Sequence, residues 1–129
     1  MQIKSAKDLI VYQKAYALAM EIFGVSKGFP AEEKYSLIDQ IRRSSRSVCT
    51  NLREAWAKRR YEAHFVSKLT AADGENGETE TWFDFAYDCS YLSRGDHAIF
   101  TEKCHEVGAM LGSMMSDPSS FILRPTSDL

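Results

Sequence analysis

Hydrophobic residues recur at intervals of three and four along most of the chain, and a few glycines and prolines interrupt them. This spacing places apolar side chains on one face of an α-helix. The pattern predicts four helices, over residues 6–27, 31–59, 62–92 and 96–115. Because the connections are short, consecutive helices run in opposite directions. We therefore expect an all-α, up-and-down four-helix bundle over residues 1–116 and a short irregular tail over 117–129.

The apolar stripes identify the expected core. In the first, third and fourth helices they comprise Val11, Ala15, Leu18, Ile22 and Val25; Phe65, Leu69, Ala72, Thr79, Phe83 and Ala86; and Ile99, Val107, Met110, Leu111 and Met114. Five large apolar residues fall outside these stripes, namely Tyr12, Tyr16, Phe23, Trp82 and Phe85. One small bundle cannot bury all five, so we expect them to lie at contacts between subunits.

The second predicted helix is divided into three stripes. Its apolar stripe comprises Leu37, Ile41, Val48, Leu52 and Ala55, and its polar row comprises Gln40, Arg43, Ser47, Asn51 and Glu54. Its basic stripe comprises Arg42, Arg46, Arg53 and Arg60 and is expected on the side away from the apolar stripe. A helix with only a core face and a solvated face needs no such division. The pattern therefore indicates an interaction surface.

The polar row has two interpretations. It could line an active site, but no nucleophile with a neighbouring base is in view. The favoured interpretation is structural, because polar side chains beside a core can bond to the next helix and fix the register of the bundle. We expect Arg43 to pair with Glu78 or Glu80 of the third helix. We also expect Asn51 and Glu54 to bond neighbouring helices.

The basic residues of this region are candidates for contact with a nucleic acid or another partner. They are Arg42, Arg46, Arg53, Lys58, Arg59 and Arg60. One interpretation is phosphate binding, because the arginine guanidinium matches the geometry of phosphate oxygens. The other is pairing of these basic residues with the third helix, which is acidic between Asp73 and Asp88. Pairing, within a subunit or across an interface, is favoured because the net charge is -2. Only Trp56 and Tyr61 flank the cluster, whereas binders of single strands usually present stacking platforms.

Composition narrows the class of protein. The chain has 129 residues, enough for one domain with its own core. Its three cysteines form no CxxC pair, which is typical of free thiols in a reducing cytoplasm. No apolar run is long enough for a signal peptide or a membrane span, so no membrane partner is expected.

Metal chemistry is the least favoured alternative. Glu102 and His105 form one Glu-x-x-His motif, but a two-metal bundle enzyme needs two such motifs and two further glutamates. We therefore expect no metal, no cofactor and no enzymatic activity. Gly74 and Gly77 lack the residues of a phosphate loop, and we expect them to allow close approach of helices.

Several motifs, taken in order and spacing, resemble one known family. They are Asp8–Ala15, Phe29–Glu33 with Tyr35 and Leu37, Gln40–Arg43 with Ser47, Asn51 and Glu54, Gly74 with Glu78 and Glu80, and Tyr91–Leu92. Over residues 8–115 the chain resembles the 23S rRNA intervening-sequence protein family. The resemblance implies a left-handed bundle assembled into a ring, commonly a homopentamer, with no established activity or agreed catalytic residues. The bundle also resembles an accessory protein of diversity-generating retroelements that binds nucleic acid, which is an analogy of fold.

This chain departs from the family pattern on one face. Arg46 and Arg53 stand where small or apolar residues are usual, and Cys49 lies between them. A contact made there should be more polar than is usual for the family. We expect a non-catalytic cytoplasmic protein that acts by homo-oligomeric assembly. The alternatives are an accessory protein that binds RNA or DNA through the basic face of the second helix, and a metal-dependent bundle enzyme.

Overall fold

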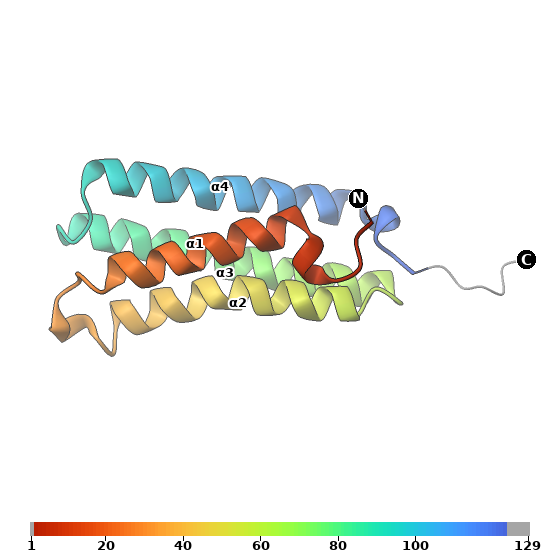
Figure 1. Ribbon diagram of the computed structural model, residues 1–129, viewed down its shortest axis with the longest axis horizontal. Helices are drawn as coiled ribbons and strands as arrows, with labels where there is room; N and C mark the ends of the chain where they lie inside the picture. Colours follow the sequence, from red (N-terminus) through yellow and green to blue (C-terminus); the bar gives the residue numbers. More distant parts are fainter. Residues whose placement is uncertain (1, 124–129) are drawn as a thin grey trace, which may run out of the picture.

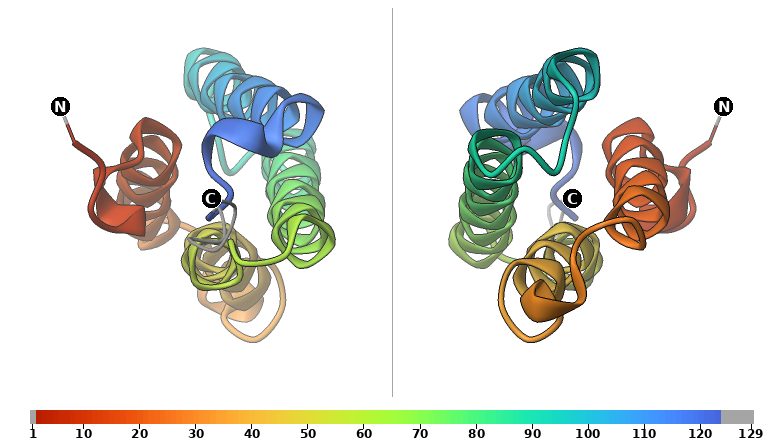
Figure 2. Two further views of the ribbon diagram at one scale, coloured as in Figure 1. Left: turned by 90° about the vertical axis from the view of Figure 1, so that its right-hand side faces the viewer. Right: turned by 90° about the vertical axis from the view of Figure 1, so that its left-hand side faces the viewer.

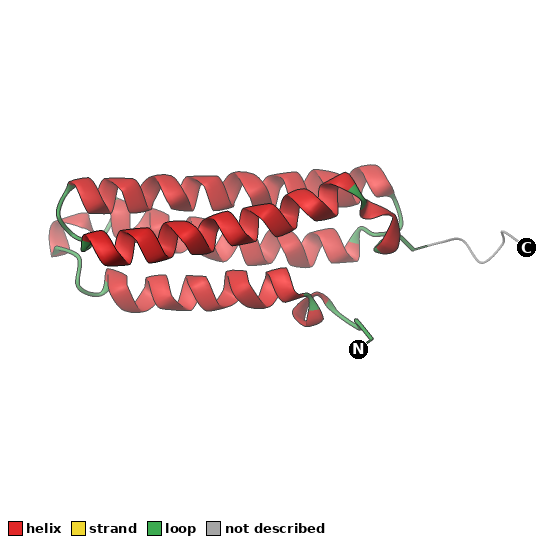
Figure 3. Cartoon of the chain, turned by 90° about the horizontal axis from the view of Figure 1, so that it is seen from above, coloured by secondary structure: helices red, strands yellow, loops and turns green. Residues whose placement is uncertain are grey.

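The computed structural model describes residues 2–123 and contains four long helices in that range, without a strand. They are α1 (Ile10–Ser26), α2 (Leu37–Ala57), α3 (Glu62–Asp88) and α4 (Arg94–Ser116). Consecutive helices run in opposite directions (Figure 1), and seen end-on they occupy the four corners of a bundle (Figure 2). Short loops at the two ends join them (Figure 3). The prediction of an all-α, up-and-down bundle is confirmed. Among the described residues, no helix has the length and apolar character needed to cross a bilayer.

Two predicted helix starts are wrong because short 3₁₀ turns precede the helices. Ala6–Asp8 forms one such turn, and Leu9 is extended (φ -70°, ψ 131°), so α1 begins at Ile10. Ala31–Glu33 forms another, and Ser36 is non-helical (φ -120°, ψ -99°), so α2 begins at Leu37. A 3₁₀ turn shares much of the hydrophobic spacing of an α-helix, so periodicity did not separate the two.

The turn between α3 and α4 also lies earlier than predicted. α3 ends at Asp88, and Ser90 adopts a positive φ of 66°. The amide of Tyr91 then donates to the carbonyl of Ala86 at 2.8 Å. Ser93 caps α4, since its Oγ accepts a hydrogen bond from the amide of Asp96 at 3.0 Å. A serine in this position is a preferred N-cap, so the segment 93–96 starts a helix.

After α4, Pro118–Ser120 forms a third short 3₁₀ turn. Residues 124–129 of the predicted tail lie outside the described residues.

The core follows most of the predicted stripes, but Val25 and Met110 are only partly buried. All five apolar positions of α2 and all six of α3 are buried. In α4 the prediction of Ile99 is wrong, because Ile99 is 50% exposed and Phe100 is buried instead. Phe100 stacks on Phe83 with ring centroids 5.2 Å apart. The stripe of α4 runs from Phe100 through Cys104 and Val107 at helical spacing, and Ile99 is off this line.

A buried polar layer separates the core into two apolar clusters. Ser44 and Thr79 share a hydrogen bond of 2.8 Å between their hydroxyl oxygens. Asn76 donates through Nδ2 to the carbonyl of Cys104 at 2.8 Å. These side chains lie along the helices between one cluster that contains Val48 and another that contains Phe83. Because buried polar groups must find partners, this layer favours one register of α2, α3 and α4.

A different glycine from those predicted lies against a buried side chain of another helix. A Cβ at Gly74 or Gly77 would meet no atom within 4 Å, so their role in close packing is wrong. A Cβ at Gly108 of α4 would lie 3.4 Å from Nδ2 of Asn76. Gly108 therefore gives Asn76 the room to reach across to α4.

One hydrogen bond ties together the two loops at the same end of the bundle. The hydroxyl of Tyr91 donates to Oε2 of Glu33 at 2.9 Å, and the hydroxyl of Ser36 donates to Oε1 of Glu33 at 2.5 Å. The bonds from Ser36 and Tyr91 lower the pKa of the Glu33 carboxyl. The carboxylate in turn raises the pKa of Tyr91 to about 12.

Candidate functional site

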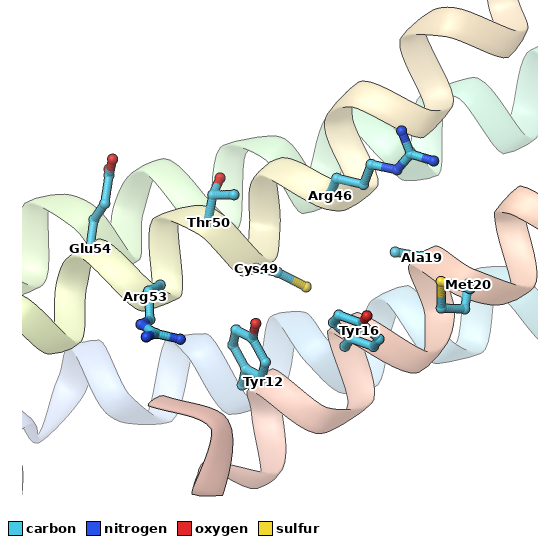
Figure 4. A pocket seen from close by; sticks show the side chains of 9 residues that line it. All are labelled: Tyr12, Tyr16, Ala19, Met20, Arg46, Cys49, Thr50, Arg53 and Glu54. Atoms are coloured by element: carbon cyan, nitrogen blue, oxygen red, sulfur yellow. The ribbon is translucent and has the colours of Figure 1, made fainter. Parts of the chain in front are cut away.

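A groove of about 520 Å³ runs between α1 and α2 (Figure 4). It is lined by Tyr12, Tyr16, Ala19, Met20, Arg46, Cys49, Thr50, Arg53 and Glu54. The α1 residues are one turn apart, and so are those of α2, which places each set on one side of its helix. We call this surface the α1–α2 groove. It combines Tyr12 and Tyr16, which lie outside the α1 stripe, with Arg46 and Arg53, which lie outside the α2 stripe.

The aromatic side of the groove is a pair of tyrosines. The rings of Tyr12 and Tyr16 are stacked, with centroids 6.1 Å apart and an interplanar angle of 27°. Tyr16 is 54% exposed, so its ring remains accessible. The floor includes Cys49, which is buried, and burial raises the pKa of its thiol to about 11. At neutral pH this cysteine stays protonated and is a poor nucleophile.

The basic side of the groove has uncompensated charge. Arg46 and Arg53 are exposed and form no salt bridge with any residue in the range 2–123. Pairing of these two with the acidic segment of the third helix, Asp73–Asp88, is therefore absent within one subunit over this range. Asp84 instead lies 2.8 Å from Nε2 of His97.

Arg42 is held against α1. Its Nε donates to Oγ of Ser26 at 2.8 Å, and its guanidinium lies 4.7 Å from the centroid of the Phe23 ring. Arg46 also lies over this ring, at 5.7 Å. The expected position of the basic stripe, away from the apolar stripe, did not predict this contact of the two arginines with α1. Phe23 is half-buried beneath the two guanidinium groups. Cations are attracted to the faces of aromatic rings, and this attraction stabilises the contact.

A second hollow, of about 440 Å³, continues the basic surface toward the start of α2. It is lined by Lys34, Tyr35, Ile38, Asp39, Arg42, Arg43 and Arg46. Arg46 borders both this hollow and the α1–α2 groove. Sequence reasoning missed Lys34 and Tyr35 as site residues. The predicted second helix included both, whereas in the structure they lie in the loop before α2.

The predicted arginine pair of the polar row is present. Arg43 bonds Glu78 of α3 and also donates to Glu75 at 2.9 Å. Gln40 accepts from Nε of Arg43 at 3.2 Å, within α2. Hydrogen bonding to Glu78 raises the pKa of Arg43. Burial acts to raise the pKa of Glu78, but the hydrogen bonds from Trp82 and Arg43 outweigh it and the pKa is lowered.

The Arg43 pair is less buried than the polar-row interpretation implied. The Arg43 side chain is 45% exposed and that of Glu78 is 35% exposed. A pair in this setting contributes about 0–1 kcal/mol, well below the figure for a buried pair.

The rest of the polar row is divided between neighbouring helices and α2 itself. Glu54 pairs with Lys68 of α3 at 2.8 Å, which confirms the predicted bond from Glu54 to a neighbouring helix. The prediction for Asn51 is wrong, because its Nδ2 donates to the carbonyl of Ser47 at 2.8 Å on the same helix. Its short side chain reaches the preceding turn more readily than another helix. Glu80 lies 2.8 Å from His105 of α4 and does not bond Arg43.

Lys58, Arg59 and Arg60 lie beyond the end of α2 and outside both hollows. The Arg59 guanidinium lies 3.5 Å from the centroid of the Trp56 ring, and its Nε donates to the Trp56 carbonyl at 2.7 Å. Lys58 and Arg60 are exposed. The structure therefore separates the six predicted contact residues into a group along α1 and a group at the bundle end.

Over residues 2–123, no three His, Cys, Asp or Glu side chains come together in a way that could hold a metal ion. His105 of the Glu-x-x-His motif bonds Glu80 instead.

The fold and the groove define a four-helix-bundle protein with an aromatic and basic surface between its first two helices. The chain belongs to the 23S rRNA-intervening sequence protein family, whose sequence model matches residues 7–113. It is also similar to the crystal structure of a protein of unknown function from the S23 ribosomal protein family of Bacteroides thetaiotaomicron VPI-5482. The two are 29% identical with a TM-score of 0.75, over 83% of this chain and 96% of that one. No curated protein matches the sequence. Neither match names a reaction.

Proposed function

We propose that this protein acts without catalysis, by assembling with copies of itself in the cytoplasm. The observation that supports the proposal is a pair of apolar surfaces on opposite faces of one bundle. A subunit with two different apolar surfaces can form head-to-tail contacts, and such contacts close into a ring when the rotation between subunits permits. Cys49, Cys89 and Cys104 are free, which agrees with a reducing compartment.

The first surface is an apolar hollow of about 440 Å³ between the start of α1 and the end of α4. Its wall includes Ile3, Ile10, Val11, Met110, Met114 and Phe121. Ile10 is 61% exposed. An apolar hollow that faces solvent is stabilised when an apolar side chain fills it, by about 25 cal/mol for each Å² removed from water.

The second surface lies on α3, on the edge nearest α2. Trp82 and Phe85 have ring centroids 5.7 Å apart, and Phe85 is 54% exposed. Trp82 donates to Glu78, which also bonds Arg43 of α2, and this places the aromatic pair at the α2–α3 edge. The end-on view shows this edge diagonally opposite the α1–α4 edge (Figure 2). In this proposal Phe85 enters the apolar hollow of a second copy.

The ring size comes from the family resemblance, which favours a homopentamer. The monomer mass is 14.6 kDa, so light scattering separates a pentamer from smaller assemblies without ambiguity. We expect a stable oligomer at micromolar concentration. A monomer mass under those conditions would contradict the proposal.

Two substitutions test the surfaces. Phe85→Ser and Ile10→Ser should each lower the assembled mass, because each removes an exposed apolar side chain from one side of the contact. Tyr61→Ser is the matched control, since Tyr61 is 58% exposed and lies at the α2–α3 turn, outside both surfaces. Circular dichroism checks that all three variants stay folded. Equal masses for Phe85→Ser and Tyr61→Ser would show that the α3 surface does not mediate assembly.

A further inference from the structure

Beyond assembly, the arginines and tyrosines between α1 and α2 form one continuous surface. The α1–α2 groove and the hollow at the start of α2 are contiguous, because Arg46 lines both. From Arg42 to Arg53 the surface follows about 17 Å of helix at 1.5 Å per residue. We call this surface, with Lys34 at one end and Tyr12 at the other, the basic track. Its length suits an extended chain better than a small anion.

We infer that the basic track binds single-stranded nucleic acid. Phosphates lie along the arginines of α2, and unpaired bases stack on the exposed tyrosines. Positive charge is available to bind phosphates, because Arg46 and Arg53 pair with no carboxylate in residues 2–123. Within the described range, Arg42 bonds only neutral oxygens, those of Ser26 and Phe23, so its charge is also uncompensated there.

Two acids border the track and oppose an anion there. Glu54 is bound to Lys68 at 2.8 Å, which offsets its charge. Asp39 lies in the first turn of α2, where the helix N-terminus partly compensates a carboxylate. The four cations Lys34, Arg42, Arg46 and Arg53 outnumber these acids. The net charge of the chain is -2, so the attraction is confined to this face and is not a property of the whole molecule.

The aromatic platforms come from elements other than α2. Tyr16 is 54% exposed beside the stacked ring of Tyr12, and Tyr35 is 84% exposed near the other end of the track. Binders of single strands combine a basic groove with aromatic rings, because every base has a face that can stack. In a duplex the bases already stack on one another, so the track favours a single strand over a duplex.

Binding is measured by fluorescence anisotropy with a labelled oligouridine of about 12 nucleotides, a length within the usual range of such sites. The test variant is the double substitution Arg46→Ala, Arg53→Ala. The matched control is Lys4→Ala, Arg94→Ala, which removes the same charge from exposed residues outside the track. We expect the test variant to bind at least about tenfold more weakly and the control to bind as the unmodified protein does.

The salt dependence identifies the phosphate contacts. Between about 50 and 200 mM salt, losing two contacts to a single strand should flatten the slope of log affinity against log salt by about 1.4. Tyr16→Ala should weaken binding about tenfold and leave this slope unchanged, because stacking releases no counterions. A structural defect would not separate the two readouts in this way.

Three results would overturn the inference. One is the absence of binding by the unmodified protein at about 50 mM salt and micromolar concentration. Another is a lack of specificity, shown by equal binding of the test variant and its control or by equal affinity for a duplex of the same length. The third is a fall in assembled mass for Arg46→Ala, Arg53→Ala alone, which would assign the track to contact with a second copy.

Discussion

The buried hydroxyl pair between α2 and α3 offers the sharpest test of the packing. Ser44 is fully buried and has two hydrogen bonds, one to Thr79 at 2.8 Å and a long one to the carbonyl of Ile41 at 3.4 Å. Thr79→Val keeps nearly the same side-chain shape and removes the shorter of the two. The Ser44 hydroxyl is then poorly satisfied away from water. We expect the free energy of unfolding to fall by about 1–2 kcal/mol.

The partner substitution should cost less. In Ser44→Ala, the hydroxyl of Thr79 still donates to the carbonyl of Glu75 at 2.9 Å, so no buried polar group is stranded. We expect a loss of about 0.5–1 kcal/mol. In the double variant both hydroxyls are replaced by apolar groups. Its loss should be smaller than the sum of the two single losses, with a coupling energy of about 1 kcal/mol.

Urea unfolding followed by circular dichroism measures these differences, at one fixed protein concentration because assembly contributes to stability. Thr81→Val is the matched control. Thr81 is exposed and makes a similar bond to the carbonyl four residues earlier, at 3.1 Å, so its loss should stay within about 0.5 kcal/mol. Equal losses for Thr79→Val and Thr81→Val, or strict additivity in the double variant, would refute the reasoning.

Three further predictions concern stability. Arg43→Ala should reduce the free energy of unfolding, measured by urea titration, by at most about 1 kcal/mol, because the pair of Arg43 with Glu78 is partly exposed. A loss above about 3 kcal/mol would contradict this. Ser90→Gly should raise the melting temperature through a gain of about 0.5–1 kcal/mol, because glycine adopts the positive φ of 66° without strain, and a lower melting temperature would contradict it. The Glu33–Tyr91 bond should stabilise the protein above pH 4.5 and below pH 10, with loss as pH falls below 4.5 or rises from 10 toward about 12. Tyr91→Phe should flatten the profile of urea midpoint against pH at the alkaline end, and an unchanged alkaline slope would refute the assignment.

Much of the fold could be predicted from the sequence because the core is periodic. The stripe from Leu37 to Ala55 lies in the core at every position, since burial follows directly from the helical repeat. Ile99 was misplaced because two adjacent apolar residues compete for one core position, and only the register of α4 selects Phe100. The early end of α3 depends on the positive φ of Ser90. The sequence did not reveal this turn, because a positive φ is usually signalled by glycine and the position holds serine.

The candidate site was less accessible to sequence reasoning because three separate segments build it. The arginines were visible on α2, but Tyr12 and Tyr16 come from α1, and Tyr35 from the connecting loop. Aromatic residues therefore accompany the basic stripe in space and not in sequence. The one signal available beforehand was the spacing of Tyr12 and Tyr16, one turn apart and outside the core stripe. Spacing alone could not show which neighbouring helix they face.

The distribution of the cysteines has a practical consequence for spectroscopy. Cys49 and Cys104 are buried, and burial raises their pKa values to about 11 and about 12, whereas Cys89 is exposed at the α3–α4 turn. A maleimide spin label should therefore attach at one place on the unmodified protein. Pulsed electron paramagnetic resonance on such a sample would give the distances between labels on different subunits. In a closed symmetric ring, the ratios of these distances depend only on the number of subunits.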